Sequence, residues 1–100
     1  NVAGRFSGSN QTVLSTKGKH DFTVQRIAVG FYKITWTTPH PDGANFIVFA
    51  QGEAVPTSAW NIIHNANTSS LANTSTSVSF VVRDNNFASV DGTMNFVVLA

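Results

Sequence analysis

Three histidines are the side chains of this sequence best suited to metal binding or acid–base chemistry. His20, His40 and His64 lie far apart along the chain, and none belongs to an H-x-x-x-H or H-E-x-x-H pattern, which places two imidazoles on one helical face. The ordinary alternative for each is a loop or strand-end imidazole that hydrogen-bonds to backbone. The sequence therefore predicts no metal site. His64 stays a candidate ligand contact, because it ends an expected strand beside Asn65, at a rim.

Five carboxylates could support hydrolysis, namely Asp21, Asp42, Glu53, Asp84 and Asp91. Asp42 and Asp91 stand in turn sequences, where aspartate is common for structural reasons. A glycosidase needs two carboxyls held about 5–10 Å apart in a cleft, and a chain of this size has little room to build one. No G-x-S-x-G motif is present to indicate a serine nucleophile. We expect no enzyme activity, no catalytic residue and no cofactor.

The composition limits the classes of partner. The chain has 100 residues, of which 11% are charged, and its formal net charge at pH 7 is +1. So small a positive charge cannot supply the phosphate contacts of ordinary nucleic-acid binding. There is no cysteine, and no apolar run approaches the roughly 20 residues that span a bilayer as a helix. We expect one domain over residues 1–100, with neither nucleic-acid binding nor membrane insertion.

Aromatic side chains could form a flat platform for a sugar ring. Tyr32 and Trp36 share one face of an expected strand with Ile34, which favours packing in the core over ligand contact. Trp60 follows a Pro-Thr-Ser-Ala stretch at a loop-to-strand junction, where an aromatic side chain can stay partly exposed. Trp60 is therefore the aromatic candidate for ligand binding, with core packing as its alternative.

Short apolar segments alternate with clusters of Gly, Pro, Asn, Asp and Ser along the whole chain. This pattern predicts strands over residues 11–16, 22–27, 31–37, 46–51, 60–64, 78–83 and 94–99, with a weaker strand around Arg5 and Phe6. No window of ten or more residues combines helical periodicity with caps, so no helix is expected.

Turn residues separate these strands. Residues 39–43 combine two prolines with a glycine that tolerates positive φ, which predicts a turn between two strong strands. Asp91 and Gly92 predict a tight hairpin turn into the last strand. Residues 65–77 consist of Asn, Thr, Ser and Ala with a single leucine, which indicates a surface loop or an edge strand.

Regularly spaced short strands without helices indicate an antiparallel β-sandwich, with an eight-stranded jelly roll as the leading topology. Residues 46–49, 80–82 and 96–99 are apolar on both faces, which a two-layer sandwich with one wet face does not require. A central strand can be covered within its own domain, but three such strands favour burial against another subunit. We therefore expect a homo-oligomer.

Residues 30–48, GFYKITWTTPHPDGANFIV, resemble the central strand-turn-strand of the small trimeric domains that end viral and phage fibre proteins. The closing residues 91–100, DGTMNFVVLA, are similar to the strand with which those chains end, and the architecture resembles the tumour-necrosis-factor-like jelly roll. The resemblance implies a homotrimer at the tip of a fibre, on the virion surface or in another extracellular place. It also implies that the chain is the C-terminal part of a longer fibre protein.

The same resemblance implies attachment to a host surface receptor, which in such domains is often a glycan. No family binding residue can be carried over, because these sites vary between members and lie in loops. We expect ligand contacts in loop 39–45, near Trp60 and in loop 65–76. The candidate contact residues are His40, Asn45, Trp60, His64, Asn67 and Asn73. For loop 65–76 the alternative is solvent-facing filler.

Two other functions stay open on the sequence. One is a carbohydrate-binding module appended to an enzyme, in which Trp60 would serve as part of the binding platform. The other is a structural capsid or appendage subunit, in which the domain provides assembly and shape alone.

Overall fold

The computed structural model describes residues 1–53, 62–68 and 71–99. These residues form eight β-strands and no helix, which confirms the all-β prediction. The strands are β1 (Val2–Ser7), β2 (Thr12–Thr16), β3 (Thr23–Ala28), β4 (Phe31–Thr35), β5 (Val48–Gly52), β6 (Ile62–Asn65), β7 (Ser77–Arg83) and β8 (Thr93–Val98). The weak strand expected around Arg5 is the six-residue β1, which pairs on both sides.

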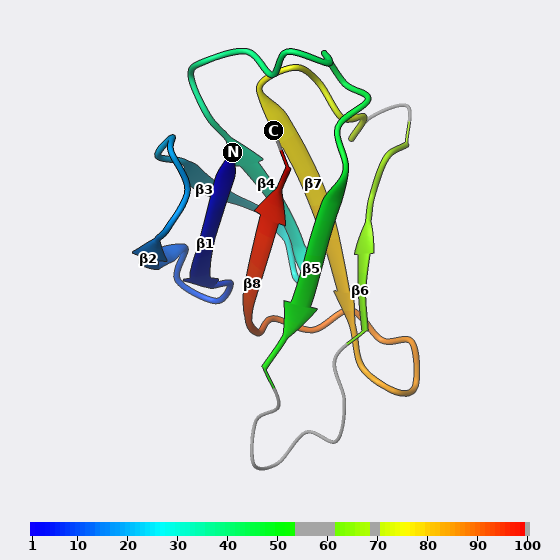
Figure 1. Ribbon diagram of the computed structural model, residues 1–100. Helices are drawn as coiled ribbons and strands as arrows, with labels where there is room; N and C mark the ends of the chain where they lie inside the picture. The colour runs from blue at the N-terminus through cyan, green and yellow to red at the C-terminus, as the bar shows by residue number, and fades with distance from the viewer. Residues whose placement is uncertain (54–61, 69–70, 100) are drawn as a thin grey trace.

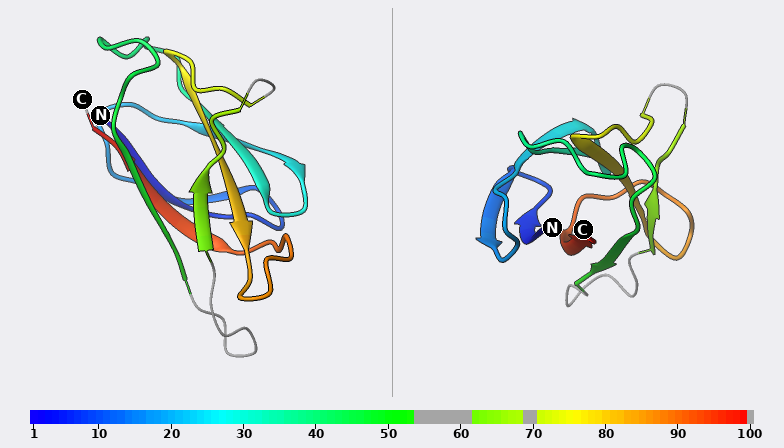
Figure 2. Two further views of the ribbon diagram at one scale, coloured as in Figure 1. Left: turned by 90° about the vertical axis from the view of Figure 1, so that its right-hand side faces the viewer. Right: turned by 45° about the horizontal axis from the view of Figure 1, so that its top comes forward.

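The strands form two four-stranded antiparallel sheets that pack as a β-sandwich (Figure 1). Sheet A has the order β2-β1-β8-β5, and sheet B has the order β3-β4-β7-β6. The first and last strands are neighbours in sheet A, with Val2 opposite Val98. The start of β1 and the end of β8 therefore lie side by side, at what we call the terminal end of the sandwich (Figures 1 and 2).

Alternation along β4 decides which of its side chains fill the sandwich. Tyr32 and Ile34 are fully buried, and Trp36, just beyond the strand, is 3% exposed, whereas Thr35 is exposed. Successive side chains of a strand point to opposite faces, so the three buried residues share the inner face. The face predicted from the sequence for Tyr32, Ile34 and Trp36 is confirmed.

The core has aromatic rings at its centre. Phe96 of β8 lies against the rings of three other phenylalanines, Phe6, Phe22 and Phe80, with ring centroids 4.9–6.2 Å apart. Offset or edge-on ring pairs of this kind add about 0.5–1.5 kcal/mol each beyond the burial of their area. The largest fully buried side chains are Tyr32, Phe6, Phe80, Ile34, Met94, Val78, Val82 and Val98.

The three segments that are apolar on both faces differ in their surroundings. Every residue of β7 except its last is buried. By contrast, Ile47 and Phe49 are each 60% exposed, and Leu99 is 39% exposed. Of the three segments, those in and around β5 and β8 therefore keep exposed apolar side chains, whereas β7 is buried within the chain.

One predicted turn is confirmed and another is wrong. Gly43 has a φ of 61°, and its N–H donates to the carbonyl of His40 at 3.0 Å, as expected for a turn at 39–43. No hairpin exists at Asp91 and Gly92, because β7 and β8 belong to different sheets. The carboxylate of Asp91 instead binds three groups in and between β3 and β4.

Strand β5 begins later than the sequence predicts. The strand expected from residue 46 begins at Val48, because the ring of Phe46 packs into the core against Trp36, with ring centroids 5.6 Å apart. The strand expected over 60–64 is β6, whose described residues begin at Ile62; Trp60 lies outside the described residues. After β6, the described residues up to 76 form a loop, as predicted.

Candidate functional site

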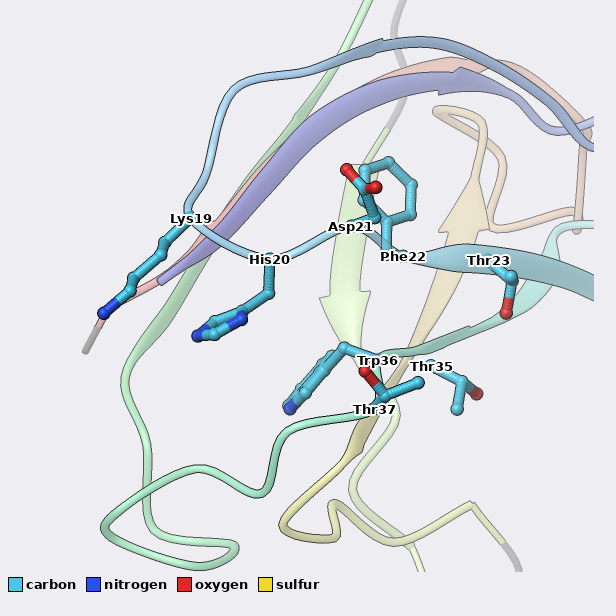
Figure 3. A pocket seen from close by; sticks show the side chains of 8 residues that line it. All are labelled: Lys19, His20, Asp21, Phe22, Thr23, Thr35, Trp36 and Thr37. Atoms are coloured by element: carbon cyan, nitrogen blue, oxygen red, sulfur yellow. The ribbon is translucent and has the colours of Figure 1, made fainter.

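A cleft opens at the terminal end of the sandwich, between two segments that contain none of the predicted contact residues. Residues 19–23, which lead into β3, form one wall, and residues 35–37, at the end of β4, form the other (Figure 3). The cleft has a volume of about 380 Å³. It forms because β3 and β4 are antiparallel, with Thr23 opposite Thr35, so the chain entering one strand runs beside the chain leaving the other.

The floor of this cleft is the small exposed part of two largely buried aromatic side chains, Phe22 and Trp36. Phe22 is 6% exposed and packs edge-on against Phe96, whereas Trp36 is 3% exposed and packs against Phe46. The indole Nε1–H of Trp36 donates to the carbonyl of Ser75 at 3.1 Å. Both rings are held from the core side, so the floor is apolar and fixed in position.

The groups around the floor are polar. Thr23, Thr35 and Thr37 bring three hydroxyls, and the imidazole of His20 lies at the end of the cleft nearest the indole of Trp36 (Figure 3). Thr23 and Thr35 are a cross-strand pair on the outer face of sheet B, which explains why both are exposed. The cleft thus combines an apolar floor with a rim of hydrogen-bonding groups.

Two residues of opposite charge, Lys19 and Asp21, also line the cleft, and both are exposed. Among the described lining residues they are the only ones with a formal charge at pH 7, since histidine is counted as neutral. Their charges cancel, so the cleft has no net charge with which to attract an ion. The alternation that exposes Thr35 and Thr37 was visible in the sequence, but nothing there indicated that they face residues 19–23.

A smaller hollow of about 160 Å³ adjoins the cleft and shares Lys19, His20 and Trp36 with it. Its other wall comes from residues 38–41, including the first part of the predicted contact loop. The predicted loop therefore lies next to the cleft, although it does not line the cleft itself.

Both ring nitrogens of His40 form hydrogen bonds with backbone groups. Its Nε2 lies 2.6 Å from the carbonyl oxygen of Leu99, and its Nδ1 accepts the N–H of Asp42 at 3.0 Å. With Nδ1 as acceptor, Nε2 carries the proton and donates to Leu99. His40 is 9% exposed, whereas Asn45 in the same loop is exposed and donates its N–H to the carbonyl of Asp42. Of these two predicted contacts, Asn45 alone presents its side chain to solvent.

The other predicted contacts lie in different places. Asn67 and Asn73 are brought together, because Oδ1 of Asn67 accepts the N–H of Asn73 at 2.9 Å, which closes their loop on itself. His64 is exposed on β6, opposite Val81, at the far edge of sheet B from β3. Trp60 is not among the described residues. The predicted contact residues thus do not converge on one site.

At the opposite end of β4, a half-buried carboxylate collects five hydrogen bonds. Arg26 reaches Asp91 through Nε and Nη2 at 2.9–3.2 Å, and the N–H of Gly30 donates to it at 2.9 Å. The hydroxyl of Tyr32 completes the set at 2.6 Å. This network joins β3 and β4 to the segment that leads into β8 of the other sheet.

The electrostatics of this network indicate a structural role. The hydrogen bonds from Arg26 lower the pKa of Asp91 to about 2, because they stabilise its charged form. Burial raises the pKa of Tyr32 above its ordinary value, and the hydrogen bond to Asp91 raises it further. At neutral pH the carboxylate is therefore charged and the phenol neutral, so neither is poised to transfer a proton.

The outer face of sheet A carries an apolar patch at the terminal end. Ala3, Val97 and Phe49 lie opposite one another across β1, β8 and β5. Ile47 and Leu99 continue this set beyond the strand ends, where the N–H of Leu99 donates to the carbonyl of Ile47 at 2.9 Å. These five residues are called the apolar patch below.

The same face becomes polar further along the strands. Arg5, Asn95 and Gln51 form one row across β1, β8 and β5. The guanidinium of Arg5 binds both carboxylate oxygens of Glu53, at 2.6 and 2.9 Å, and this lowers the pKa of Glu53. The pair is exposed, so it stabilises the fold little, but it marks the polar border of the apolar patch.

The described residues contain no group of three or more His, Cys, Asp or Glu side chains placed to hold a metal ion. Nor does this part of the chain contain a helix long and apolar enough to cross a membrane. Comparison with protein-family models, with curated proteins and with solved structures finds no match for this chain.

Proposed function

We propose that this chain is a trimeric fibre-tip domain of a virus or phage, which attaches the fibre to a host surface receptor such as a glycan. The observation that carries the proposal is the apolar patch, in which Ile47 and Phe49 each expose 60% of their surface. Contiguous exposed apolar side chains on a sheet face are typical of an interaction surface.

Further copies of the same chain are the occupant that fits this patch best. The neighbouring charges, Arg5 and Glu53, already pair with each other within the chain, so this pair does not select a partner of opposite sign. Identical subunits arranged as a closed ring bury the same patch in every copy. The number three comes from the resemblance of residues 30–48 and 91–100 to trimeric fibre-tip domains.

The jelly-roll topology belongs to this proposal. One feature of the sheet order supports it, namely that the first and last strands, β1 and β8, pair with each other. Three of the six strand pairs, β1–β2, β3–β4 and β6–β7, instead join strands that follow one another in the chain.

The proposed mechanism is multivalent binding without catalysis. Three identical sites held in one trimer bind a surface with an avidity well above that of one site, so each site can be weak and shallow. The cleft at 19–23 and 35–37 is such a shallow site, and Asp21 is the single carboxylate among its described lining residues. A glycosidase would need two.

Sedimentation equilibrium in dilute solution tests the assembly. We expect a species of three times the 10.7 kDa chain mass, and we expect Phe49→Arg to sediment as a folded monomer, because it places a charge in the apolar patch. Phe87→Arg is the matched control, since Phe87 is 67% exposed but lies on the connection between β7 and β8. A wild-type chain that sediments as a monomer contradicts the proposal.

Cell attachment is tested with the same three proteins. Wild type and Phe87→Arg should bind receptor-bearing cells or a glycan array, and Phe49→Arg should bind at least about a hundredfold more weakly, because it loses avidity. A stable trimer that binds neither cells nor glycans would instead favour a structural capsid or appendage subunit.

A carbohydrate-binding module appended to an enzyme is the second candidate, and the cleft favours it. The cleft belongs to one chain and needs no neighbour to complete it, since all eight residues that line it come from 19–23 and 35–37. A monomeric wild-type chain that binds sugar would support this candidate over the trimeric fibre tip.

A further inference from the structure

We infer that the cleft between residues 19–23 and 35–37 binds a neutral saccharide unit. The inference rests on the proposed function, because it names the receptor group that the attachment domain holds. Nothing in the sequence selected this cleft, and the predicted contacts His40, Asn45, His64, Asn67 and Asn73 do not line it.

The size of the cleft suits a small ligand. Its volume of about 380 Å³ falls at the lower end of the roughly 300–1,000 Å³ that small-molecule sites occupy. Two hydrogen bonds to Asn1 hold the wall at 19–23 in place. The N–H of His20 donates to the backbone carbonyl of Asn1 at 3.2 Å, and the N–H of Lys19 donates to the side-chain oxygen of Asn1. The cleft is therefore a formed feature of the fold.

The arrangement of apolar and polar groups matches the surface of a sugar ring. A pyranose has apolar C–H groups on its faces and hydroxyls around its edge. The cleft reaches the small exposed parts of the buried rings of Phe22 and Trp36, whereas Thr23, Thr35 and Thr37 line its outer, exposed side. Figure 3 shows these threonines and the imidazole of His20 along the two walls. A sugar in the cleft places apolar C–H groups against the exposed parts of the rings and its hydroxyls against the threonines.

The polar rim excludes a purely apolar ligand. A threonine hydroxyl both donates and accepts hydrogen bonds, and so does each hydroxyl of a sugar. The imidazole of His20 adds one donor and one acceptor when neutral. An apolar ligand would remove these groups from water without replacing their hydrogen bonds, which costs free energy, whereas a saccharide replaces them.

The charges select a neutral saccharide over an acidic or basic one. Lys19 and Asp21 lie in the same wall, two residues apart, so an anion that approaches the ammonium also meets a carboxylate. A cation that approaches the carboxylate of Asp21 likewise meets the ammonium of Lys19. The hydroxyl groups that the two walls contribute, from Thr23, Thr35 and Thr37, are uncharged.

The test is a titration of the ¹⁵N-labelled wild-type chain, followed by NMR. The probes are the methyl glycosides of glucose, galactose and mannose, with N-acetylneuraminic acid as the acidic probe. We expect at least one neutral glycoside to shift the amide signals of residues 19–23 and 35–37 with saturation in the millimolar range, about −4 kcal/mol. Shifts confined to other residues, or cleft shifts with the acidic probe alone, overturn the inference.

Two pairs of variants locate the site. His20→Ala should weaken glycoside binding about two- to tenfold, as expected for the loss of one neutral hydrogen bond, whereas His64→Ala at the far edge of sheet B should not. Thr35→Val should weaken binding similarly, and Thr16→Val, at the exposed end of β2, should not. Binding that is unchanged in both cleft variants contradicts the inference.

The failure of this inference is distinguishable from failure of the proposed function. A trimer that attaches to cells but shows no glycoside shifts in the cleft overturns the saccharide site and leaves the attachment domain. A monomer that binds glycosides in the cleft overturns the trimer and leaves the saccharide site.

Discussion

The hydroxyl of Tyr32 donates a 2.6 Å hydrogen bond to the carboxylate of Asp91, and this contact joins a central strand of sheet B to the segment that leads into β8. Tyr32 itself is fully buried and packs edge-on against Phe6, with ring centroids 5.5 Å apart. The phenol therefore contributes to the core through its ring and to the link between the sheets through its hydroxyl.

Replacing either partner of this contact should destabilise the fold. We expect Tyr32→Phe to lower the free energy of unfolding by about 1–3 kcal/mol, because it removes one hydrogen bond to a charged group and keeps the ring. Asp91→Asn should lower it by about 2–4 kcal/mol, because Arg26 then lacks its counter-charge. Urea unfolding measures both variants.

The double variant identifies the contact itself. If the hydroxyl acts through Asp91, the losses of the two single variants should not add, and the cycle should show a coupling of about 1 kcal/mol. Strictly additive losses would contradict the proposed link. Asp42→Asn, an exposed turn carboxylate, is the matched control and should change stability by less than about 0.5 kcal/mol.

The stability of the chain should fall in acid through Asp91. Its pKa is about 2 in the folded chain and about 3.9 when unfolded, so the folded state favours the charged form. The stabilisation is complete above about pH 5 and is lost as the pH falls towards 2. Urea unfolding at several pH values should show this loss in the wild type and a smaller one in Asp91→Asn.

Glu53 also has a lowered pKa, because Arg5 hydrogen-bonds to its carboxylate. It is present in both proteins, so the difference between the wild type and Asp91→Asn isolates the contribution of Asp91. Curves that run parallel from pH 7 to pH 2 would rule out this assignment.

Two glycines with positive φ should differ in their tolerance of a side chain. Gly30 has a φ of 70°, and a Cβ there would lie 2.6 Å from the carbonyl oxygen of Val82. Gly43 has a φ of 61° and no atom within 4 Å of the same position. Gly43→Ala should therefore cost about 1–2 kcal/mol of backbone strain, and Gly30→Ala clearly more. Equal losses in urea unfolding would show that the contact at Val82 relaxes freely.

His40 and His64 should differ in their contribution to stability. His40→Ala removes two hydrogen bonds and the ring that packs on Phe46, so we expect a loss of about 2–4 kcal/mol in the free energy of unfolding. His64→Ala, on an exposed edge position, should stay within about 0.5 kcal/mol of the wild type. Thermal unfolding checks both, and a stable His40→Ala variant would mean that Leu99 and Asp42 find other partners.

Much of the fold could be predicted from local pattern. The period-two alternation at Tyr32, Ile34 and Trp36 identified both the strand and its buried face, because a strand turns successive side chains to opposite sides. The glycine at 43 marked a turn, because it tolerates positive φ. These features depend on a few neighbouring residues, so a short stretch of sequence is enough to specify them.

Strand pairing could not be predicted from local pattern, as Asp91 shows. Its neighbour Gly92 indicated a local hairpin, yet the carboxylate binds Arg26, Gly30 and Tyr32, which lie some sixty residues away in the chain. Alternation specifies which face of a strand is buried but not which strand lies beside it. The pairing depends on packing across both sheets, which no single segment encodes.

The candidate site divides in the same way. The sequence by itself determined an all-β chain with few charges and with segments apolar on both faces at 46–49, 80–82 and 96–99. Only the tertiary structure decided that β7 is buried, that β5 and β8 keep an exposed apolar patch, and that residues 19–23 meet 35–37 in a cleft. The reason is that each of these features depends on segments that are far apart in the chain and that strand pairing brings together. The residues of one segment do not specify which other segment will lie beside it.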